Sequence, residues 1–363
     1  MLFYMRDITV EELQTIKNPI IIDIRSPIEF KDGAIPDAIN IPLFTDEERE
    51  IIGTIYKHEG QATAKWKAME FVSPKIPALL NQIKEAMTNG EDLVIHCWRG
   101  GMRSKAVVTF LEFAGIYAMR LSGGYKAYRQ YILQQIPTMF PEKAIVLHGL
   151  TGVGKTEVLK NLKLRGYPTL DLEEMAAHRG SIFGTIGLGE GNNQKTFDSL
   201  LYKGLQEIQG SSHFIMEAES KRIGKVVQPE EMMDKKMKGI NIYIHTPLKQ
   251  RVKQLVNEYV IPFQNEPWYH EQISIGMEKI LRRIKDTEMK KALVHKVENK
   301  EYQEMIGILL EYYYDPRYDH ATLEYDGKFI DIYADDSMDA SMKVMAEIDK
   351  LLLKKKKVYE GQI

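Results

Sequence analysis

The one cysteine of this 363-residue sequence lies in a stretch whose residue types suit nucleophilic chemistry. Cys97 ends an apolar run and is followed by two glycines, and a helical pattern begins at Ser104. A strand-to-helix turn of this kind gathers backbone N–H groups, which lower the pKa of a thiol and stabilise a bound anion. Arg103, six positions after the cysteine, can close this turn over an oxyanion or a persulfide. The stretch therefore predicts Cys97, Arg103 and the neighbouring Arg99 as catalytic residues.

This spacing of cysteine and arginine is compatible with two chemistries. In the first, the thiolate attacks a phosphoryl group, as in cysteine-dependent phosphatases. In the second, the cysteine carries or displaces sulfur or a related atom. The loop by itself does not separate them.

A second loop has the sequence motif of a phosphate-binding loop. Residues 149–156 match G-x-x-x-x-G-K-[ST] in full, directly after an apolar run that ends at His148. Glycines in this position let backbone N–H groups surround a di- or triphosphate, while the lysine reaches the terminal phosphate and the threonine hydroxyl can hold Mg²⁺. The motif predicts a phosphorylated ligand, and Mg²⁺ as a possible cofactor, at Gly149, Gly152, Gly154, Lys155 and Thr156.

Acidic and basic side chains cluster in the segments that follow this loop. Each of four acids comes at or just after the end of an apolar run, where it could bind metal or substrate or simply cap a helix. These candidates are Asp171, Glu173, Glu217 and Glu219. Two runs rich in glycine and cations supply candidate anion-binding residues, namely Arg179, Ser181, Lys221 and Arg222.

The elements around these loops have the pattern of parallel sheets with covered faces. Short apolar runs alternate with helical patterns, which is typical of α/β proteins. The predicted strands are 19–24, 92–97, 117–121, 144–148, 169–172, 213–217 and 240–245, and helices are predicted at 104–113 and, by its apolar period, at 277–284. The sequence thus predicts an α/β domain over 1–138, a phosphate-loop α/β domain over 139–248 and a mainly helical region over 249–363.

The overall charge does not mark the chain as a nucleic-acid binder, because the formal net charge is −2. Any RNA contact therefore needs local basic charge, and 278–300 has eight Lys or Arg residues against four acids. Its candidate RNA contacts are Arg282, Arg283, Lys290 and Lys291, and the run 354–357 is a second candidate. Phosphate contacts of this kind would make the affinity for RNA fall steeply with salt concentration.

The sequence also indicates where the chain is expected to work. No apolar run approaches the roughly 18 residues that span a bilayer, and the first ten residues lack the pattern of a signal peptide. A single cysteine allows no disulfide within the chain. We therefore expect no membrane contact and a cytoplasmic location.

The first third of the sequence resembles rhodanese-like domains. The resemblance rests on 23–30, on 33–42 and on the closing turn 121–124, and it covers about 5–135. It implies that Asp23 and Arg25 form an ion pair that fixes a loop. Two features depart from the usual pattern: position 34 is alanine where many rhodaneses have histidine, and the cysteine loop is one residue longer than in ordinary sulfurtransferases.

The fusion of such a domain to a phosphate loop resembles the bacterial tRNA 2-selenouridine synthases. The stretches 97–104, 123–129, 178–181 and 219–224, together with the phosphate loop, carry this resemblance over about 5–320. It implies a rhodanese-like parallel-sheet domain, a P-loop NTPase-like domain and a helical C-terminal extension. It also implies a tRNA partner that carries 2-thiouridine at the wobble position, and an enzyme that supplies selenophosphate is a further expected partner.

The chemistry implied by this resemblance is a two-step transfer. A geranyl group from geranyl diphosphate is attached to the sulfur, and selenium from selenophosphate then replaces the S-geranyl group. Lys155 and Thr156 would hold the departing diphosphate, and an apolar pocket that the sequence does not locate would hold the isoprenoid chain. Cys97 would serve the selenium step as nucleophile or carrier, with Arg99 and Arg103 on the phosphate oxygens.

Three other interpretations stay open at this point. One is a rhodanese-type sulfurtransferase coupled to nucleotide binding, and another is a cysteine-dependent phosphatase joined to a kinase-like domain. The third is a regulatory module in which both loops only bind anions.

Overall fold

The computed structural model describes residues 6–87, 91–317, 325 and 328–360, the last seven by their backbone alone. The chain divides into two compact units. The first comprises 1–136 together with 198–203, and the second comprises 137–197 together with 204–363.

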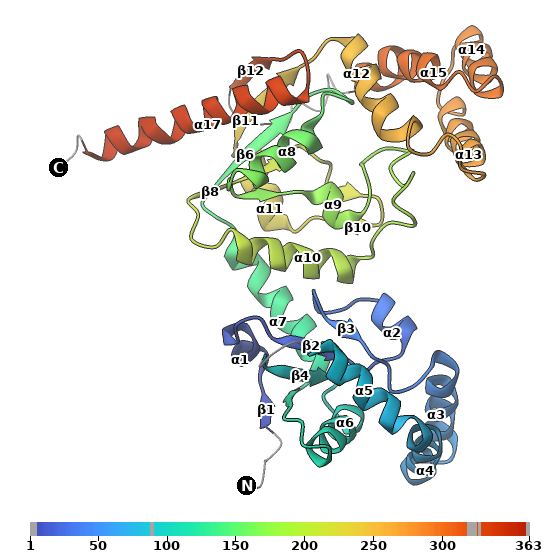
Figure 1. Ribbon diagram of the computed structural model, residues 1–363. Coiled ribbons are helices and arrows are strands. Elements are labelled where there is room, and N and C mark those ends of the chain that lie inside the picture. Colours follow the sequence, from blue (N-terminus) through green and yellow to red (C-terminus); the bar gives the residue numbers. More distant parts are fainter. Residues whose placement is uncertain (1–5, 88–90, 318–324, 326–327, 361–363) are drawn as a thin grey trace. The chain divides into compact units, whose positions relative to one another are not determined.

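The first unit is built on a five-stranded parallel sheet of order β1-β5-β4-β2-β3 (Figure 1). Its elements are β1 (Arg6–Ile8), α1 (Val10–Thr15), β2 (Ile20–Asp23), α2 (Pro27–Lys31), β3 (Ile39–Asn40), α3 (Asp46–His58), α4 (Gln61–Val72), η1 (Ser73–Lys75), α5 (Ile76–Ala86), β4 (Leu93–His96), α6 (Met102–Phe113), β5 (Met119–Leu121) and α7 (Gly124–Met139). All four residues of β4 are buried, as expected for a central parallel strand with both faces covered.

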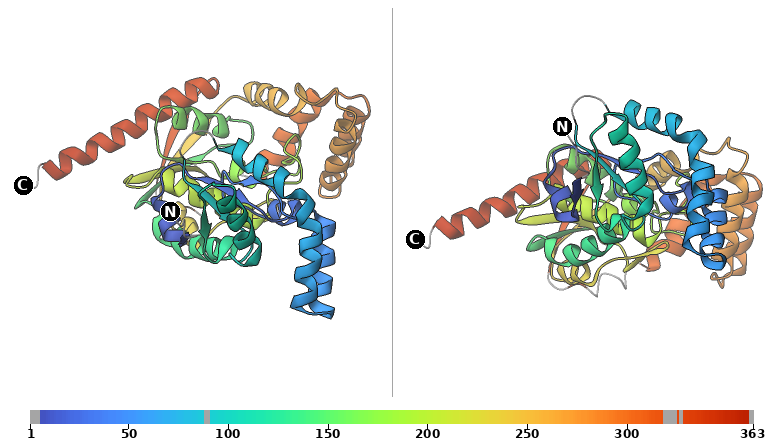
Figure 2. Two further views of the ribbon diagram at one scale, coloured as in Figure 1. Left: turned by 60° about the horizontal axis from the view of Figure 1, so that its bottom comes forward. Right: turned by 90° about the horizontal axis from the view of Figure 1, so that it is seen from below.

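The core of this unit explains why the cysteine loop has a fixed position. Side chains of β2 and β4 pack with Val107 and Leu111 of α6 and with Leu79 and Ile83 of α5. Cys97 belongs to the same apolar cluster, so the strand before the loop and the helix after it are both anchored. Helices α3 and α4 pack against each other as a pair, which is visible in Figures 1 and 2.

The second unit also has a five-stranded parallel sheet, in the order β12-β11-β6-β8-β7. Up to β11 its elements are β6 (Lys143–His148), α8 (Lys155–Leu164), β7 (Thr169–Leu170), α9 (Leu172–Ala176), α10 (Gln194–Glu207), β8 (His213–Glu217), β9 (Arg222–Ile223), β10 (Val226–Val227), α11 (Glu230–Met237) and β11 (Ile240–His245). Strands β9 and β10 form a separate antiparallel pair. The carboxyl ends of β6 and β8 bring the phosphate loop and the acidic residues to one edge of the sheet.

A cluster of helices follows β11 and has an apolar core of its own. It consists of α12 (Leu248–Leu255), the π-helices η2 (Val256–Val260) and η3 (Leu310–Tyr314), α13 (Tyr269–Leu281), α14 (Thr287–Glu298) and α15 (Tyr302–Leu309). Ile273, Met277 and Ile280 of α13 pack with Leu293 of α14 and Met305 of α15. Their spacing within α13 is the helical period that the sequence shows at 277–284.

The chain then returns to the sheet. Strand β12 (Phe329–Tyr333) pairs in parallel with β11, and α17 (Ser337–Glu360) packs Val344 and Ile348 into the same core as Val158 and Leu162 of α8. Figures 1 and 2 show the last turns of α17 running out beyond the sheet. The mainly helical region predicted from 249 onward therefore also supplies an edge strand, which the sequence analysis did not identify.

The predicted fold class is confirmed, and most strands lie where the apolar runs placed them. Predicted strands 213–217 and 240–245 match β8 and β11 residue for residue, and 92–97 is observed as 93–96. Helix α6 begins at Met102, two residues before the predicted start. Within the described part of the chain, no helix has the length and apolarity that crossing a membrane requires.

Candidate active site

The cysteine loop of the first unit is held by backbone contacts to the turn after β5. The N–H groups of Tyr125 and Lys126 donate to the carbonyls of Cys97 and Trp98, at 2.9 Å each. Gly124 has a φ of +56°, and a Cβ added there would lie 2.2 Å from the Cys97 carbonyl oxygen. Only glycine permits this approach, so the Gly-Gly pair of the closing turn sets the backbone of the cysteine loop.

The environment of Cys97 favours the thiolate. The residue is 3% exposed, and its Sγ lies 3.3 Å from the Ser104 hydroxyl. Burial alone raises the pKa of the thiol, but the Ser104 hydrogen bond, the charge of Arg103 and backbone N–H groups at the helix start outweigh it, so the pKa lies below its ordinary value. A thiol pKa lowered in this way is a feature that reactive cysteines share.

We expect the thiolate absorbance of the protein to titrate with a midpoint below that of the chain unfolded in denaturant. Cys97 is the only cysteine, so the signal belongs to it alone. Ser104→Ala removes the hydroxyl that is hydrogen-bonded to the sulfur and should move the midpoint upward. Thr109→Ala, an exposed position on the same helix, should leave it in place. Equal midpoints for wild type and Ser104→Ala would contradict this assignment.

Arg103 is fixed by a residue that the sequence analysis did not single out. Its guanidinium donates to the Glu29 carboxylate at 2.6 and 3.3 Å, and Arg49 lies 3.6 Å from the same carboxylate. Although burial opposes it, the Arg103 hydrogen bond and charge hold the pKa of Glu29 below its usual range. Arg103 is thereby held beside Cys97 as a cation, while Arg99 is exposed to solvent.

A buried ion pair lies under the loop. The Arg25 guanidinium donates to Asp23 at 2.9 and 3.0 Å and to the Gly33 carbonyl at 2.7 Å, and both charged side chains are fully buried. The guanidinium also lies 4.1 Å from the ring centroid of Tyr125. The ion pair expected from the rhodanese resemblance is present. It joins the end of β2 to the turn that holds the cysteine loop.

The phosphate loop of the second unit has the predicted strand-loop-helix setting. Lys155, the first residue of α8, donates to the Gly149 carbonyl at 3.0 Å, and the Thr156 hydroxyl donates to Glu173 at 3.1 Å. Gly154 has a φ of +84°, and a Cβ there would lie 2.8 Å from the side chain of Ser337. The start of α17 therefore packs directly on this loop.

Arg251 is a second residue that the sequence analysis did not name. It is buried, forms a bidentate ion pair with Asp315 at 2.8 and 2.7 Å, and donates to the Thr151 carbonyl at 3.3 Å. Since a guanidinium held by a carboxylate has little freedom, Arg251 fixes the middle of the phosphate loop. Its contact lies 100 positions away in the chain, so no local spacing could reveal it.

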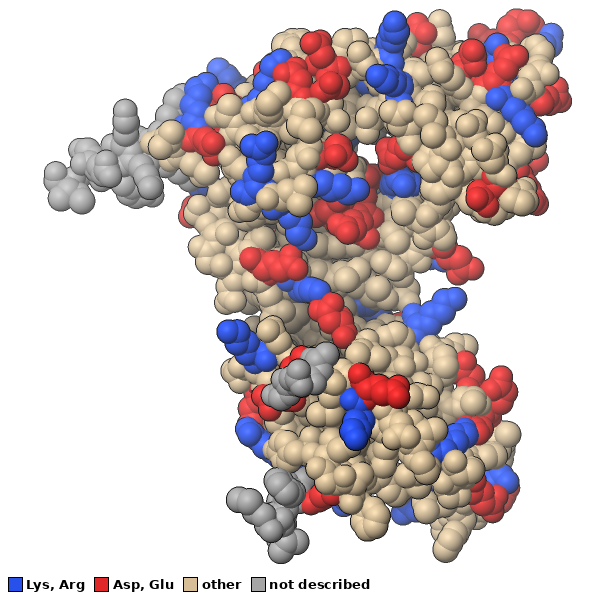
Figure 3. Space-filling model, viewed as in Figure 1, with Lys and Arg blue, Asp and Glu red and all other residues tan. Residues whose placement is uncertain are grey.

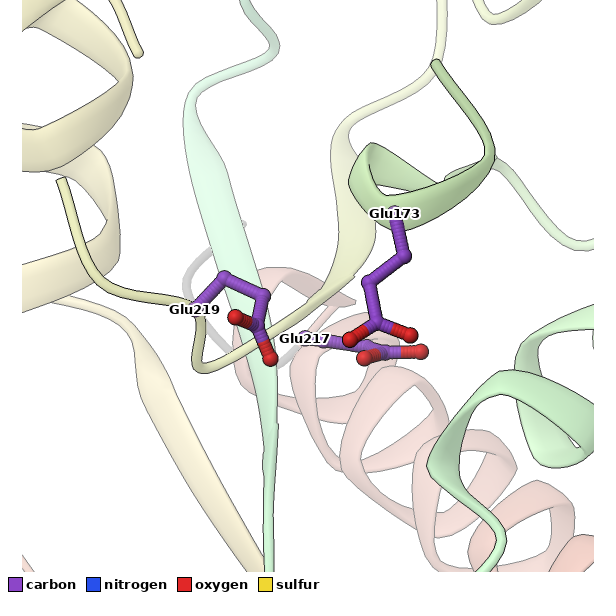
Figure 4. Close-up of side chains that lie close together, drawn as sticks. All are labelled: Glu173, Glu217 and Glu219. Carbon is purple, nitrogen blue, oxygen red and sulfur yellow. The ribbon is translucent and has the colours of Figure 1, made fainter. Parts of the chain in front are cut away.

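Three of the four predicted acids gather beside the phosphate loop. One oxygen from each of Glu173, Glu217 and Glu219 lies within 4.8 Å of the others, and Figure 4 shows the three carboxylates pointing toward one another. Burial and then the charge of Glu219 raise the pKa of Glu173 to about 8, and burial followed by the charge of Glu173 raises the pKa of Glu217 well above normal. Burial likewise raises the pKa of Glu219, although Lys155 and Lys236 oppose it.

The remaining candidates lie elsewhere in this unit. Asp171 caps α9 by accepting the Glu174 N–H at 2.9 Å. Arg179 is paired with Glu258 at 2.6 Å. Lys221 and Arg222 are exposed on and before β9, and Lys221 lies 3.4 Å from Glu230. Ser181 lines a pocket rather than one of these charged groups.

That pocket is apolar and reaches the phosphate loop. Its space for the centres of water-sized molecules is about 50 Å³, and Thr151 and Ser181 lie at its polar part. Phe183 and side chains of the helical cluster form the rest of its wall. The residues from the helical cluster are Leu255, Tyr259, Tyr269, Ile273, Met305, Ile306, Leu309, Leu310 and Tyr314. The lining is that of a site for an apolar group, because few polar atoms face this space.

The predicted basic segment lies on α13, α14 and the turn between them. Arg282, Arg283 and Lys291 are exposed, and Lys290 is half-buried. Some of this charge is locally balanced, since Arg282 lies 3.8 Å from Glu278 and Lys291 lies 2.9 Å from Glu288. On the face shown in Figure 3, positive and negative side chains alternate over this cluster. Its contact with tRNA stays a prediction, and the side chains of 354–357 lie outside the described residues.

Known protein families match both of the domains that contain the two loops. A rhodanese-like domain model matches residues 9–131, and the model of the tRNA 2-selenouridine synthase AAA domain matches residues 142–349. The tRNA 2-selenouridine synthase of Sulfurovum sp. is 32% identical over 84% of this chain and 89% of its own length. That of Hydrogenovibrio crunogenus is 32% identical over 86% and 94%, and that of Aeromonas salmonicida 31% over 82% and 86%. With both of its units matched and most of its length covered, this chain belongs to the tRNA 2-selenouridine synthase family.

Proposed function

We propose that the protein is a tRNA-modifying transferase that replaces the sulfur of wobble 2-thiouridine by selenium. The reaction proceeds through an S-geranyl intermediate, with geranyl diphosphate and selenophosphate as co-substrates. Membership in a family named for tRNA 2-selenouridine synthesis supports the overall reaction. The two chemically distinct loops support its division into two steps, with the phosphate loop serving the first and the cysteine loop the second.

The observation that carries the first step is the apolar pocket that opens at the phosphate loop. Thr151 belongs to both, so a ligand with its phosphates on the loop N–H groups and Lys155 can extend an apolar chain along α13 and α15. A nucleotide whose phosphates bound to the same loop would place its polar sugar in this apolar pocket. The lining suits an isoprenoid diphosphate better, because burying hydroxyl groups without hydrogen-bond partners is costly.

The geranyl step needs the protein mainly to stabilise its leaving group. The thiouridine sulfur attacks the first carbon of the geranyl chain, a C–S bond forms as the C–O bond breaks, and the base releases its N3 proton. The diphosphate leaves with the bonding electrons. In this proposal Lys155, at the start of α8, and the loop N–H groups stabilise that growing negative charge, which is the usual way in which such sites lower a barrier.

The selenium step uses the alkylated sulfur as the leaving group. Selenium from selenophosphate becomes bonded to C2 of the base, the C–S bond breaks, and the geranyl thiol leaves with a proton while water takes the phosphate. Cys97 acts here as nucleophile: its thiolate bonds to C2 as the geranyl thiolate leaves, and selenide from selenophosphate then displaces Cys97 from C2. Its lowered pKa supports this role, and Arg103 and Arg99 supply positive charge for the phosphate oxygens.

Nucleoside mass spectrometry on 2-thiouridine tRNA tests this function. The protein with geranyl diphosphate alone should give S-geranyl-2-thiouridine, and addition of selenophosphate should convert it to 2-selenouridine. Lys155→Ala should lose the first product yet still convert tRNA that was geranylated beforehand. A wild-type protein that leaves the tRNA unchanged in both reactions would refute the proposal.

The apolar pocket gives a sharper prediction for the isoprenoid chain. Ile273 lines the pocket and is 3% exposed, so Ile273→Ala should weaken geranyl diphosphate binding about tenfold by removing apolar contacts. Calorimetry with inorganic pyrophosphate should show unchanged affinity, because the phosphate loop stays intact. Ile275→Ala, at a position 48% exposed on the same helix, should alter neither ligand. If Ile273→Ala weakens the binding of both ligands, or of neither, the isoprenoid chain does not bind in this pocket.

A further inference from the structure

Three glutamates of the second unit form a compact set of oxygen donors. Glu217 is the last residue of β8, Glu219 follows two positions later, and Glu173 lies in the first turn of α9. Their carboxylates converge, with one oxygen of each within 4.8 Å of the others (Figure 4). Adjacent ligand oxygens on a Mg²⁺ ion lie about 3 Å apart and opposite ones about 4.2 Å. The three groups therefore need only small movements to share one ion.

The most buried member of this set has an oxygen with no partner. Glu217 is 1% exposed, and among the described residues its Oε1 accepts no hydrogen bond. Buried polar atoms are nearly always hydrogen-bonded or bound to an ion, because an unpaired one is costly. Since Glu217 points into the cluster, this atom indicates a ligand that lies between the carboxylates.

The surrounding positive charge does not balance three carboxylates. Lys155 acts electrostatically on all three, and Lys236 acts on Glu219. Lys155 is also the residue that faces the phosphates of a bound ligand, and that ligand brings further negative charge to the same place. A divalent cation would supply the missing charge without crowding the loop.

The donor set favours one class of ion. All of the converging atoms are carboxylate oxygens, and the cluster contains no cysteine or histidine. Oxygen ligands select hard cations such as Mg²⁺, Mn²⁺ and Ca²⁺, and Mg²⁺ is commonly held by one or two carboxylates plus substrate phosphates. The Thr156 hydroxyl of the phosphate loop contacts Glu173 at 3.1 Å, so the cluster adjoins the place where phosphates bind.

We propose that Glu173, Glu217 and Glu219 bind one divalent cation of the Mg²⁺ class beside the phosphate loop. Glu217 supplies the buried inner ligand, Glu219 and Glu173 close the site from the loop and from α9, and the open side faces the phosphates. The site is a property of the chain alone and forms whichever phosphorylated ligand the loop accepts.

Mn²⁺ binding to the full chain, followed by the paramagnetic resonance signal of free Mn²⁺, tests the site directly. The wild type should bind one Mn²⁺ that Mg²⁺ displaces, and Glu217→Gln should weaken binding at least about tenfold. Glu157→Gln is the matched control: it removes the same charge from an exposed position in the first turn of α8 and should bind Mn²⁺ like the wild type.

A folding control and a second variant distinguish loss of the metal site from loss of the fold. Pyrophosphate binding in metal-free buffer shows whether Glu217→Gln still folds, and Glu219→Gln should weaken Mn²⁺ binding as well if Glu217→Gln does not fold. A wild type without Mn²⁺ binding, or equal affinity in Glu217→Gln and Glu157→Gln, would overturn the proposal. The assay contains neither tRNA nor an isoprenoid, so its result is independent of the proposed function.

Discussion

Cys97→Ser is expected to abolish formation of 2-selenouridine, with a loss on the order of 10³-fold or more, while geranylation continues. A serine hydroxyl is almost entirely protonated at neutral pH, whereas the environment of Cys97 lowers the pKa of its thiol. The chain contains no second cysteine that could replace it. Single-turnover conversion of geranylated tRNA in the presence of selenophosphate, quantified by nucleoside mass spectrometry, measures the effect.

Two controls distinguish a chemical role of Cys97 from a structural one. Binding of geranyl diphosphate should be the same in Cys97→Ser and the wild type, because the proposed site for it belongs to the second unit. Ser104→Ala, which keeps the thiol and only removes its hydroxyl partner, should give a smaller loss that shrinks as the pH rises. Undiminished selenium incorporation in Cys97→Ser would mean that Cys97 takes no part in the exchange.

The second large effect concerns stability. Arg25→Met should lower the free energy of unfolding of the first unit by about 3–5 kcal/mol, because it leaves the Asp23 carboxylate buried without its partner. The same substitution at Arg6, whose ion pair with Glu12 is exposed, should cost less than about 1 kcal/mol. Urea unfolding, monitored by hydrogen exchange of amides in the first unit, measures the free energy of unfolding of each variant.

A second substitution identifies the origin of that loss. If the unpaired carboxylate causes it, adding Asp23→Asn to Arg25→Met should recover part of the stability, since the buried charge is then gone. If the double variant is instead destabilised by the sum of the single effects, the packing of Arg25 against Tyr125 accounts for the loss.

Much of the fold could be predicted because its signals are local. The buried strands β4, β6 and β8 are short apolar runs, and the phosphate loop is one contiguous motif between a strand and a helix. Strand β12 has a weaker signal of the same kind, since Asp331 interrupts the apolar and aromatic residues of Phe329-Ile330-Asp331-Ile332-Tyr333. The helical pattern on either side hid it, and five residues in isolation are ambiguous.

The contacts that hold the two loops could not be predicted from spacing. Glu29 and Arg103 are 74 positions apart, and Arg251 and Thr151 are 100 apart. Their ion pairs and hydrogen bonds exist only because separate strands end at the same sheet edge. The convergence of Glu173 with Glu217 has the same origin, so the sequence could name these acids as candidates but could not indicate that they share one small volume.

The position of β12 has a consequence for how the chain folds during synthesis. All five strands of the first unit are complete by Leu121, so this sheet can form while most of the chain is still being made. The second sheet receives its edge strand only at Phe329, and the Ser337 side chain that packs on the phosphate loop comes later still. Until then β11 has an open edge whose backbone groups can pair with other chains. A chain that is released before Phe329 is made would therefore have a folded first unit joined to a second unit whose β11 edge is open to aggregation.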